Sequence, residues 1–298
     1  MIVGPSREPV GLIAGAGRFP IVFAEKAREV GIPVVCVGVA GMADPYLKTI
    51  CHRFHWLRRL SLGFILRSFR NGGVRQWTMA GKYHKQLLFR PWRYFQLIPD
   101  WRILRFWLHR HRGDRRDDSL LLGLIREFRD EGFDCVSALD LCPELLVREG
   151  VLTRRKPTSS EEQDIRFGWK MARELGRLDI GQSVMVRENN VLAVEAIEGT
   201  DQAILRAGTL CGRSAFVVVK VAKPQQDMRF DVPTVGTMTI ETMKQAGAKV
   251  LAIEAGRTIL LDEVQTIARA DELGLTLVAY TDERMGYSYR ITETGSKD

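Results

Sequence analysis

The sequence predicts an α/β protein with a Rossmann-like parallel sheet in an N-terminal domain and a second α/β domain after it. Apolar runs that end in glycine alternate with amphipathic segments of helical spacing, which is typical of βαβ units. The 298 residues also exceed the usual length of one domain, about 100–200 residues. A polar, irregular stretch interrupts the pattern near its middle. We therefore expect an N-terminal domain at 1–142, a linker at 143–161 and a C-terminal α/β domain at 162–298.

The N-terminal half begins as a strand, a glycine turn, a helix and a second strand. Pro20 suits the first turn of that helix, where its missing N–H is not needed, and Gly31 suits the position after the helix end. Gly81 marks the end of a later strand, and Gly132 precedes another strand. We predict strands at 10–14, 33–37, 74–80 and 134–139, and helices at 21–30, 60–69 and 120–129.

The C-terminal half repeats the alternation without an internal sequence repeat. Asn189-Asn190 lies between two short apolar runs and predicts a hairpin. We predict strands at 184–187, 191–195, 215–221, 250–253, 258–261 and 275–280, and helices at 162–175, 237–246 and 263–273.

Positive charge is concentrated in one segment. Residues 53–116 contain sixteen Lys and Arg against two acidic residues, a net charge of +14, whereas the whole chain carries +8. The segment also holds five of the six tryptophans: Trp56, Trp77, Trp92, Trp101 and Trp107. Basic groups interleaved with indoles suit an anionic membrane surface, single-stranded nucleic acid, or a solvated basic face over a Trp-rich core.

Hydropathy and cysteine usage favour a cytoplasmic protein. No stretch reaches the roughly 18 apolar residues of a transmembrane helix, and the first residues lack the apolar region of a signal peptide. The five cysteines are odd in number and form no CxxC pair. They indicate small buried hydrophobes, not a disulfide framework or a zinc site.

The glycine turn after the first strand suggests a nucleotide or phosphate site. Gly15 and Gly17 would let the backbone approach a pyrophosphate at a helix N-terminus. Pro20, however, stands where a GxGxxG motif has its third glycine, and the second strand ends in Val39-Ala40 without an acid for a ribose hydroxyl. A nicotinamide-dependent oxidoreductase is therefore disfavoured, while a phosphate role and a simple tight turn remain equally open.

Two polar loops in the C-terminal half supply the groups that pyrophosphate cleavage needs. The first follows a strand and contains Glu198, Gly199, Thr200 and Asp201, where Thr200 could simply cap a helix. The second contains Lys220, Lys223, Gln226, Arg229, Asp231 and Thr234. Cations offset phosphate charge, and a carboxylate holds Mg²⁺ or orients water. A loop ion-pair network is the alternative interpretation of the same residues.

Five motifs in order resemble one family across residues 10 to about 280. They are Gly11 to Pro20 (GLIAGAGRFP), Ala80-Gly81-Lys82, Asp117-Asp118 before a helix ending Glu131-Gly132-Phe133, Gly176 to Gln182 (GRLDIGQ), and the stretch from Glu195 to Gly236. This pattern resembles the LpxI-type UDP-2,3-diacylglucosamine pyrophosphatases. The segment 83–116 is richer in aromatic residues and arginines than that pattern, and Arg115-Arg116 displaces the acidic pair.

The resemblance implies two α/β domains and a specific reaction. It implies hydrolysis of a lipid-linked UDP-sugar, with Mg²⁺, to UMP and 2,3-diacylglucosamine 1-phosphate in lipid A biosynthesis. It makes Asp231, in an Arg-x-Asp-x-Pro-Thr motif, the essential carboxylate, which we expect to hold Mg²⁺ or to orient water, and it assigns catalytic roles to Lys223 and Arg229. The substrate-binding residues that we expect are Gly15, Gly17, Gly81, Lys82, Glu198, Gly199, Thr200, Asp201, Lys220, Gln226 and Thr234.

The partners that we expect follow from the same resemblance and from the charge pattern. We assign the basic Trp-rich segment, 53–116, to docking on anionic lipid, which makes the protein peripheral to the inner membrane. Nucleic acid is not expected as a partner, and a homodimer is an open possibility. A membrane- or nucleic-acid-binding module without catalysis is the competing hypothesis, but it gives no reason for the polar groups at 220–231.

Overall fold

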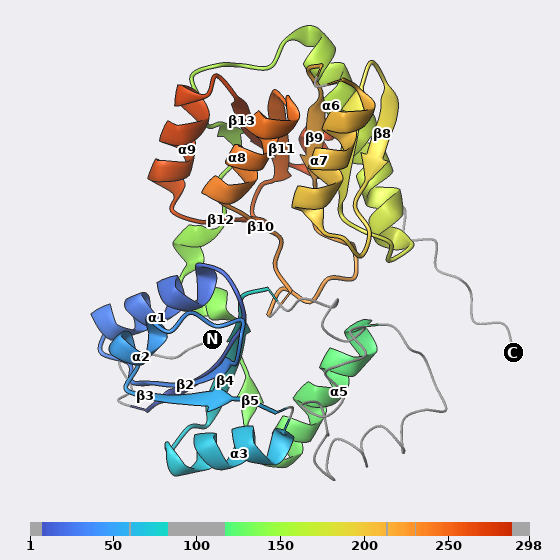
Figure 1. Ribbon diagram of the computed structural model, residues 1–298. Coiled ribbons are helices and arrows are strands. Elements are labelled where there is room, and N and C mark those ends of the chain that lie inside the picture. The colour runs from blue at the N-terminus through green and yellow to red at the C-terminus, as the bar shows by residue number, and fades with distance from the viewer. Residues whose placement is uncertain (1–7, 60, 83–116, 213, 230, 288–298) are drawn as a thin grey trace, which may run out of the picture. The chain divides into compact units, whose positions relative to one another are not determined.

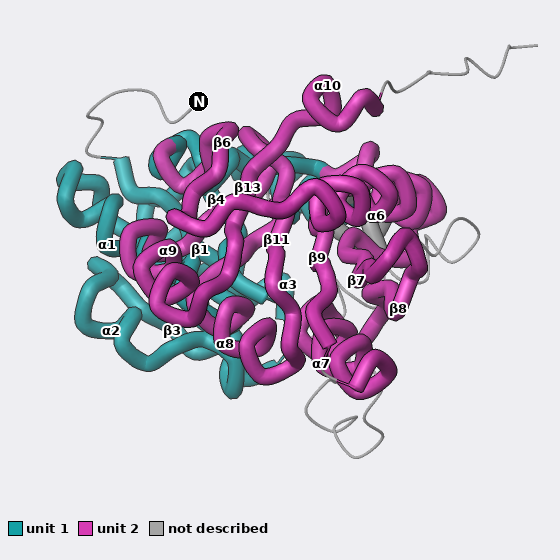
Figure 2. The backbone as a smooth tube through the Cα atoms, turned by 90° about the horizontal axis from the view of Figure 1, so that it is seen from above, with its two compact units in different colours: residues 1–143, 227–231 teal, residues 144–226, 232–298 magenta. Residues whose placement is uncertain are grey.

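The computed structural model describes residues 8–59, 61–82, 117–212, 214–229 and 231–287, with the side chains of 117–122 excepted. The chain forms two compact units, shown in different colours in Figure 2. Unit 1 comprises residues 1–143 and 227–231, and unit 2 comprises 144–226 and 232–298. A short segment inside the C-terminal half therefore belongs to the N-terminal unit. We describe the units separately.

Unit 1 contains a five-stranded, wholly parallel sheet of order β3-β2-β1-β4-β5 (Figure 1). The strands are β1 (Val10–Ala14), β2 (Val34–Val39), β3 (Arg53–Leu57), β4 (Gln76–Ala80) and β5 (Asp134–Cys135). The chain runs outward from β1 to β3 and then returns to place β4 on the other side of β1. This reversal creates a topological switch point, beside which doubly wound sheets bind their ligands.

Helices cover both faces of this sheet. They are α1 (Phe19–Glu29), α2 (Leu47–Ile50), α3 (Leu62–Asn71) and α5 (Asp117–Asp130), with α1 and α3 on opposite faces (Figure 1). The core under α3 and α5 is aromatic, because Trp77 is fully buried and its ring centroid lies 4.1 Å from that of Phe128. Gly11 is required in β1, since a Cβ there would lie 2.7 Å from the ring of Phe69.

Unit 2 contains a six-stranded mixed sheet of order β6-β13-β11-β9-β7-β8. Its strands are β6 (Gly150–Val151), β7 (Ser183–Arg187), β8 (Asn190–Val194), β9 (Val217–Lys220), β11 (Val250–Glu254) and β13 (Thr276–Tyr280). The central strands β9, β11 and β13 are parallel, whereas β7 runs antiparallel to β9 and to β8. The start of β7 and the end of β8 therefore lie at the same edge as the carboxyl end of β9. A separate parallel pair joins β10 (Thr234–Val235) to β12 (Ile259–Leu260).

Helices lie on both faces of this second sheet as well. Helix α6 (Ser159–Arg177) packs on β7 and β9, and its N-terminus carries a capping box in which Thr158 and Glu161 exchange hydrogen bonds. The other face carries α7 (Thr200–Leu210), α8 (Thr237–Ala246) and α9 (Glu263–Glu272). A short helix, α10 (Asp282–Met285), follows β13. Among the described residues, no helix is both long and apolar enough to cross a bilayer.

The predicted fold class is confirmed, with local differences. Strand β5 stops at Cys135 because Ser137 accepts the N–H of Leu139 and starts a 3-10 turn, Ala138–Asp140. The predicted hairpin exists, but its turn is at Glu188-Asn189, where both residues have positive φ and donate their backbone N–H groups to the carboxylate of Asp164.

Some elements carried too weak a signal to be predicted. The structure adds β3, α2, β6, β10 and α10 to the predicted set. Strand β3 mixes Arg, His and aromatic residues, and the others are short. The interval 143–161 contains the 3-10 turn Pro143–Leu145, strand β6 and the first residues of α6. Strand β6 pairs with β13, so part of this interval belongs to the sheet of unit 2.

Candidate active site

The glycine turns after β1 and β4 meet at the switch point of unit 1. Ala16 and Lys82 exchange both backbone hydrogen bonds, at 2.9 and 2.8 Å. Gly17 and Gly81 each have φ +98°, a conformation that favours glycine. A Cβ on Gly81 would lie 2.7 Å from the carbonyl oxygen of Ala16. The structure therefore brings together the predicted residues Gly15, Gly17, Gly81 and Lys82 at one edge of the sheet.

An open hollow of about 530 Å³ is lined in part by Gly17 of the first of these turns. Residues that follow β1 and β2 line it together with Trp56 of β3, so it lies at the carboxyl edge of the sheet. Arg18 borders the hollow and contacts Glu25 at 3.3 Å, and α1 begins there without a side-chain cap. Pro20 has no N–H, and the N–H of Ile21 donates to the carbonyl of Arg18 at 3.0 Å, so the helix start offers few N–H groups to an anion, although the hollow lies where parallel sheets commonly bind nucleotides.

The segment 227–231 packs on unit 1 through the residues that follow β5. Ser137 donates its hydroxyl hydrogen to the carbonyl of Met228 at 3.3 Å. Within the segment, the N–H of Asp231 donates to the carbonyl of Asp227 at 3.1 Å. This compact turn places Asp231 and Arg229 on a segment anchored at the end of β5, the strand next to β4.

Arg229 is held by a carboxylate that the sequence did not single out. Asp227 accepts hydrogen bonds from Nε of Arg229 at 2.9 Å and from Nη2 at 2.6 Å. These bonds hold the pKa of Asp227 below its usual value and raise the pKa of Arg229. The guanidinium is therefore fully charged and oriented before any ligand arrives.

A preformed metal cage is absent from the described residues, which contain no cluster of three or more His, Cys, Asp or Glu side chains arranged around one point. Mg²⁺ does not require such a cage, since one or two carboxylates commonly bind it while water and substrate phosphates fill the other positions. Asp231 provides one carboxylate of this kind. The donor set thus fits a magnesium ion that binds together with a phosphate substrate.

Lys220 ends β9 as a buried ammonium among oxygen atoms of unit 2. Its side chain is only 6% exposed, and Nζ donates to the hydroxyl of Thr200 at 3.1 Å and to the carbonyl of Thr234 at 3.1 Å. Thr200 in turn donates to Glu195 at 3.0 Å. The structure therefore joins Lys220, Thr200 and Thr234, three residues predicted to bind substrate.

Thr200 does not cap helix α7, contrary to the simplest expectation. The N-cap is Gly199, with φ +86° and no side-chain hydrogen bond, and Thr200 is the first helical residue. Its hydroxyl instead belongs to the network around Lys220. The neighbouring acids support the helix region, because Glu198 accepts a hydrogen bond from Arg206 at 2.6 Å and Asp201 accepts one from Thr239 at 3.3 Å.

Lys223 lies in the loop after β9 and is fixed through its backbone and its ammonium. Gln226 closes the loop, accepting the N–H of Lys223 at 2.9 Å and donating its own N–H to the Lys223 carbonyl at 3.1 Å. The ammonium of Lys223 contacts the carboxylate of Asp179 at 2.5 Å. Gln226 therefore shapes the loop, and Asp179 holds the cation that was predicted to act on phosphate.

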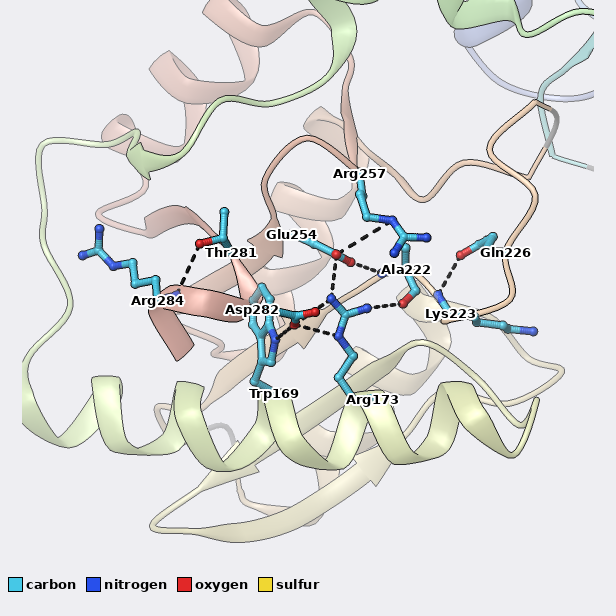
Figure 3. Close-up of polar contacts among 10 residues, drawn as sticks. All are labelled: Trp169, Arg173, Ala222, Lys223, Gln226, Glu254, Arg257, Thr281, Asp282 and Arg284. Carbon is cyan, nitrogen blue, oxygen red and sulfur yellow. Dashed lines mark hydrogen bonds and ion pairs between the residues drawn. The ribbon is translucent and has the colours of Figure 1, made fainter. Parts of the chain in front are cut away.

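A buried ion network clamps the peptide just before Lys223 (Figure 3). Arg173 of α6 donates to the carbonyl of Ala222 at 2.8 Å, while Glu254 of β11 accepts the N–H of Ala222 at 2.8 Å. Arg173 also contacts Glu254 at 2.6 Å and Asp282 at 2.7 Å. Trp169 donates to Asp282 at 2.7 Å. Both polar groups of Ala222 are thus held by charged side chains.

Sequence reasoning missed the partners that orient the predicted cations. Only Arg173 left a clear signal, because it follows Trp169 by four residues and Ile165 by eight and therefore lies on the apolar stripe of α6. A charge on that stripe indicates a buried partner. The missed residues are Arg173, Asp179, Ser183, Glu195, Asp227, Glu254 and Asp282.

The fold and these groups define an α/β protein with phosphate-directed chemistry: a switch point bordered by glycine turns in unit 1, and lysines held by oxygen networks in unit 2. Comparison with known proteins makes the class specific. The LpxI N-terminal domain family matches residues 9–145, and the LpxI C-terminal domain family matches residues 148–278. The chain is also 34% identical over 274 residues to the UDP-2,3-diacylglucosamine pyrophosphatase LpxI of Caulobacter vibrioides, covering 89% of this chain and 95% of that protein. The chain belongs to the LpxI family.

Proposed function

We propose that this protein hydrolyses the pyrophosphate of UDP-2,3-diacylglucosamine in lipid A biosynthesis. Water adds to one phosphorus, the bond from that phosphorus to the bridging oxygen breaks, and the products are UMP and 2,3-diacylglucosamine 1-phosphate. Family membership over both halves of the chain supports this reaction. The observation that carries it is the loop from Lys220 to Thr234, which combines fixed cations with a carboxylate.

Asp231 is the proposed catalytic carboxylate. It orients the attacking water and accepts its proton, or it holds Mg²⁺. When bound, Mg²⁺ would offset charge on the phosphate oxygens as a Lewis acid. Asp231 lies on a segment anchored by Ser137, so its position does not depend on a long free loop.

Fixed cations stabilise the charge that grows on the departing phosphate. Lys223 and Arg229 are the proposed catalytic cations, and Lys220 binds a phosphate oxygen. Asp179 and Asp227 already orient two of these cations. Thr200 and Thr234 fix two hydrogen-bond directions of the Lys220 ammonium.

The glycine turns of unit 1 are proposed to receive the nucleotide part of the substrate. Gly15, Gly17, Gly81 and Lys82 border the switch point, and Gly17 also lines the open hollow. The glycine turns, with Gly17 and Gly81 at positive φ, let the backbone approach a phosphate oxygen closely. With the nucleotide assigned to these turns, Lys223, Arg229 and Asp231 are proposed to act on the pyrophosphate bond that breaks.

The decisive assay incubates the purified protein with UDP-2,3-diacylglucosamine and follows UMP by chromatography, with Mg²⁺ added or chelated. We expect UMP and an equal amount of 2,3-diacylglucosamine 1-phosphate, and loss of both on chelation. UDP-N-acetylglucosamine, which lacks the acyl chains, serves as the control substrate. Absence of UMP from the diacylated substrate in the presence of Mg²⁺ would contradict the proposed function.

We also propose that the basic Trp-rich segment, 53–116, docks the protein on anionic lipid. Trp77 takes no part in this, because it is fully buried in the core, and Trp56 is half-buried with Lys48 Nζ 5.1 Å from its ring centroid. Residues 83–116, with the other three tryptophans, lie outside the described residues. Sedimentation with anionic and neutral liposomes, beside a titration of single-stranded DNA, tests the proposal. DNA binding at physiological salt without liposome binding would contradict it.

A further inference from the structure

We infer that Glu195 is a positioning residue that fixes the ammonium of Lys220 through the hydroxyl of Thr200. This inference rests on the proposed function, in which Lys220 binds a phosphate oxygen of the substrate. Glu195 follows β8 and lies at the carboxyl edge of the unit 2 sheet, where β9 ends in Lys220. Neither the predicted site nor the mechanism above gives this carboxylate a role.

The side chains of Glu195, Ser183, Thr200 and Lys220 form a buried network. Glu195, Ser183, Thr200 and Lys220 are each less than 10% exposed. Ser183 contacts one carboxylate oxygen of Glu195 at 2.5 Å, and Thr200 contacts the other at 3.0 Å. Ser183 also stands directly opposite Lys220 in the register of β7 and β9. The carboxylate is thus shared by two hydroxyls, one of which touches the ammonium.

The backbone holds Glu195 where it can act in this way. Its N–H donates to the carbonyl of Ser183 at 2.9 Å. Gly181 packs so closely that a Cβ there would lie 1.9 Å from the carbonyl oxygen of Glu195. Such an approach is open only to glycine, so the turn before β7 and the end of β8 are locked together. The backbone from which the carboxylate extends is therefore fixed beside the two hydroxyls.

The orientation of the hydroxyl hydrogens determines how the ammonium of Lys220 is held. An ionised carboxylate only accepts hydrogen bonds, so both hydroxyl hydrogens point toward Glu195. Thr200 then presents only lone pairs to Lys220, and an ammonium only donates. Thr234 fixes a second direction of the same ammonium through its carbonyl. Glu195 therefore determines where the positive charge of Lys220 lies, although it does not touch the ammonium itself.

Replacing the carboxylate by an amide breaks this order without removing volume. In Glu195→Gln one of the two hydroxyls faces an NH₂ group, which donates, so the hydrogen of that hydroxyl must turn away. If this hydroxyl is the one of Thr200, its hydrogen would point toward the ammonium of Lys220. Displacement of a catalytic group by about 1 Å can cost roughly 100-fold in rate. We expect kcat for UMP release to fall about 10- to 100-fold, with KM changed by less than about threefold, because the charge acts mainly in the transition state.

A double-mutant cycle distinguishes positioning from general support of the fold. If Glu195 acts through Lys220, Glu195→Gln should change kcat by less than about twofold once Lys220→Met is present. Thr200→Val should behave like Glu195→Gln, and Thr200→Ser, which keeps the hydroxyl, should recover most of the activity. This second pair also decides the question if Glu195→Gln fails to fold.

The matched control is Asp164→Asn, which removes another buried carboxylate of unit 2. Asp164 accepts the N–H groups of Glu188 and Asn189 at 3.0 and 2.7 Å, at the hairpin turn. It should lower the melting temperature but leave kcat within about twofold in both backgrounds. Equal losses from Glu195→Gln with and without Lys220→Met, or wild-type kcat in Thr200→Val, would overturn the inference. An inactive wild-type protein would instead contradict the proposed function.

Discussion

Replacing Arg173 by Met should destabilise unit 2 and loosen the loop that carries Lys223. Met has a similar reach and keeps the apolar contacts of the side-chain stem, so the change removes mainly the guanidinium. Arg173 is 2% exposed, and its group binds Glu254, Asp282 and the carbonyl of Ala222. After the replacement, the partners that Glu254 keeps among the described residues are Arg257, at 3.8 Å, and the N–H of Ala222.

The size of the expected stability loss follows from the burial of the ion pair. Removing one partner of a buried ion pair costs about 3–5 kcal/mol, because the other charge is left poorly compensated. Asp282 is 37% exposed, so water screens its share, and most of the cost comes from Glu254, which is 6% exposed. For a unit of about 150 residues, 1 kcal/mol corresponds to roughly 2–4 °C in melting temperature, so the expected fall is about 6–20 °C.

Calorimetry measures this fall, and hydrogen exchange of the β9 and β11 amides assigns it to unit 2. Arg154→Met is the matched control, because the Arg154 side chain is 92% exposed and pairs with Asp271 at 3.6 Å. An exposed pair contributes about 0–1 kcal/mol, so the control should melt close to the wild-type temperature. A loss below about 1 kcal/mol in Arg173→Met would refute the reasoning, since Glu254 would then be satisfied without Arg173.

Three further predictions concern unit 1. Asp231→Ala should lower UMP release by several powers of ten while the melting temperature stays unchanged, as judged by kinetics and calorimetry together; near-normal release would remove Asp231 from the mechanism. Arg229 lowers the pKa of Asp227 in the folded state, so the pair stabilises fully above the usual Asp pKa of about 3.9, and this contribution is lost as the pH falls through the folded value. Asp227→Asn should therefore flatten the fall in stability between about pH 5 and pH 3 in urea titrations, and an unchanged slope would contradict the pair's role. Gly81→Ala should lower the free energy of unfolding by about 1–3 kcal/mol, more than Gly132→Ala does. Both glycines have positive φ, but only a Cβ on Gly81 would meet a carbonyl oxygen, at 2.7 Å. Equal losses of stability would show that the turn at Gly81 relaxes to accept the methyl group.

The order of elements could be predicted because local signals mark it. Strand β1 and helix α8 have the predicted bounds, since apolar runs bounded by glycine and regular helical spacing are visible in the chain. The short pieces could not be predicted in this way. Strand β10 has two residues and exists because it pairs with β12, 24 positions or more along the chain. Its pattern contains no period to detect.

The cations of the candidate site could be predicted, but their partners could not. Lys220, Lys223 and Arg229 lie in one polar stretch directly after an apolar strand, where the sequence marks a functional loop. Asp179 comes from a turn 44 residues before its partner Lys223, and no local pattern connects the two. Asp227 is closer, two residues before Arg229, yet only the fold of the turn decides that the two side chains meet.

Strand direction explains why the network around Lys220 forms at all. In a purely parallel sheet, the residue beside the carboxyl end of β9 would end a neighbouring strand, as Glu254 ends β11. Because β7 is antiparallel, Ser183 begins its strand there, and the returning β8 brings Glu195 to the same edge. A hydroxyl and a carboxylate separated by one hairpin thus reach a lysine 25 or more residues further along. The mixed sheet therefore supplies unit 2 with an oxygen network that a wholly parallel arrangement would place at the opposite edge.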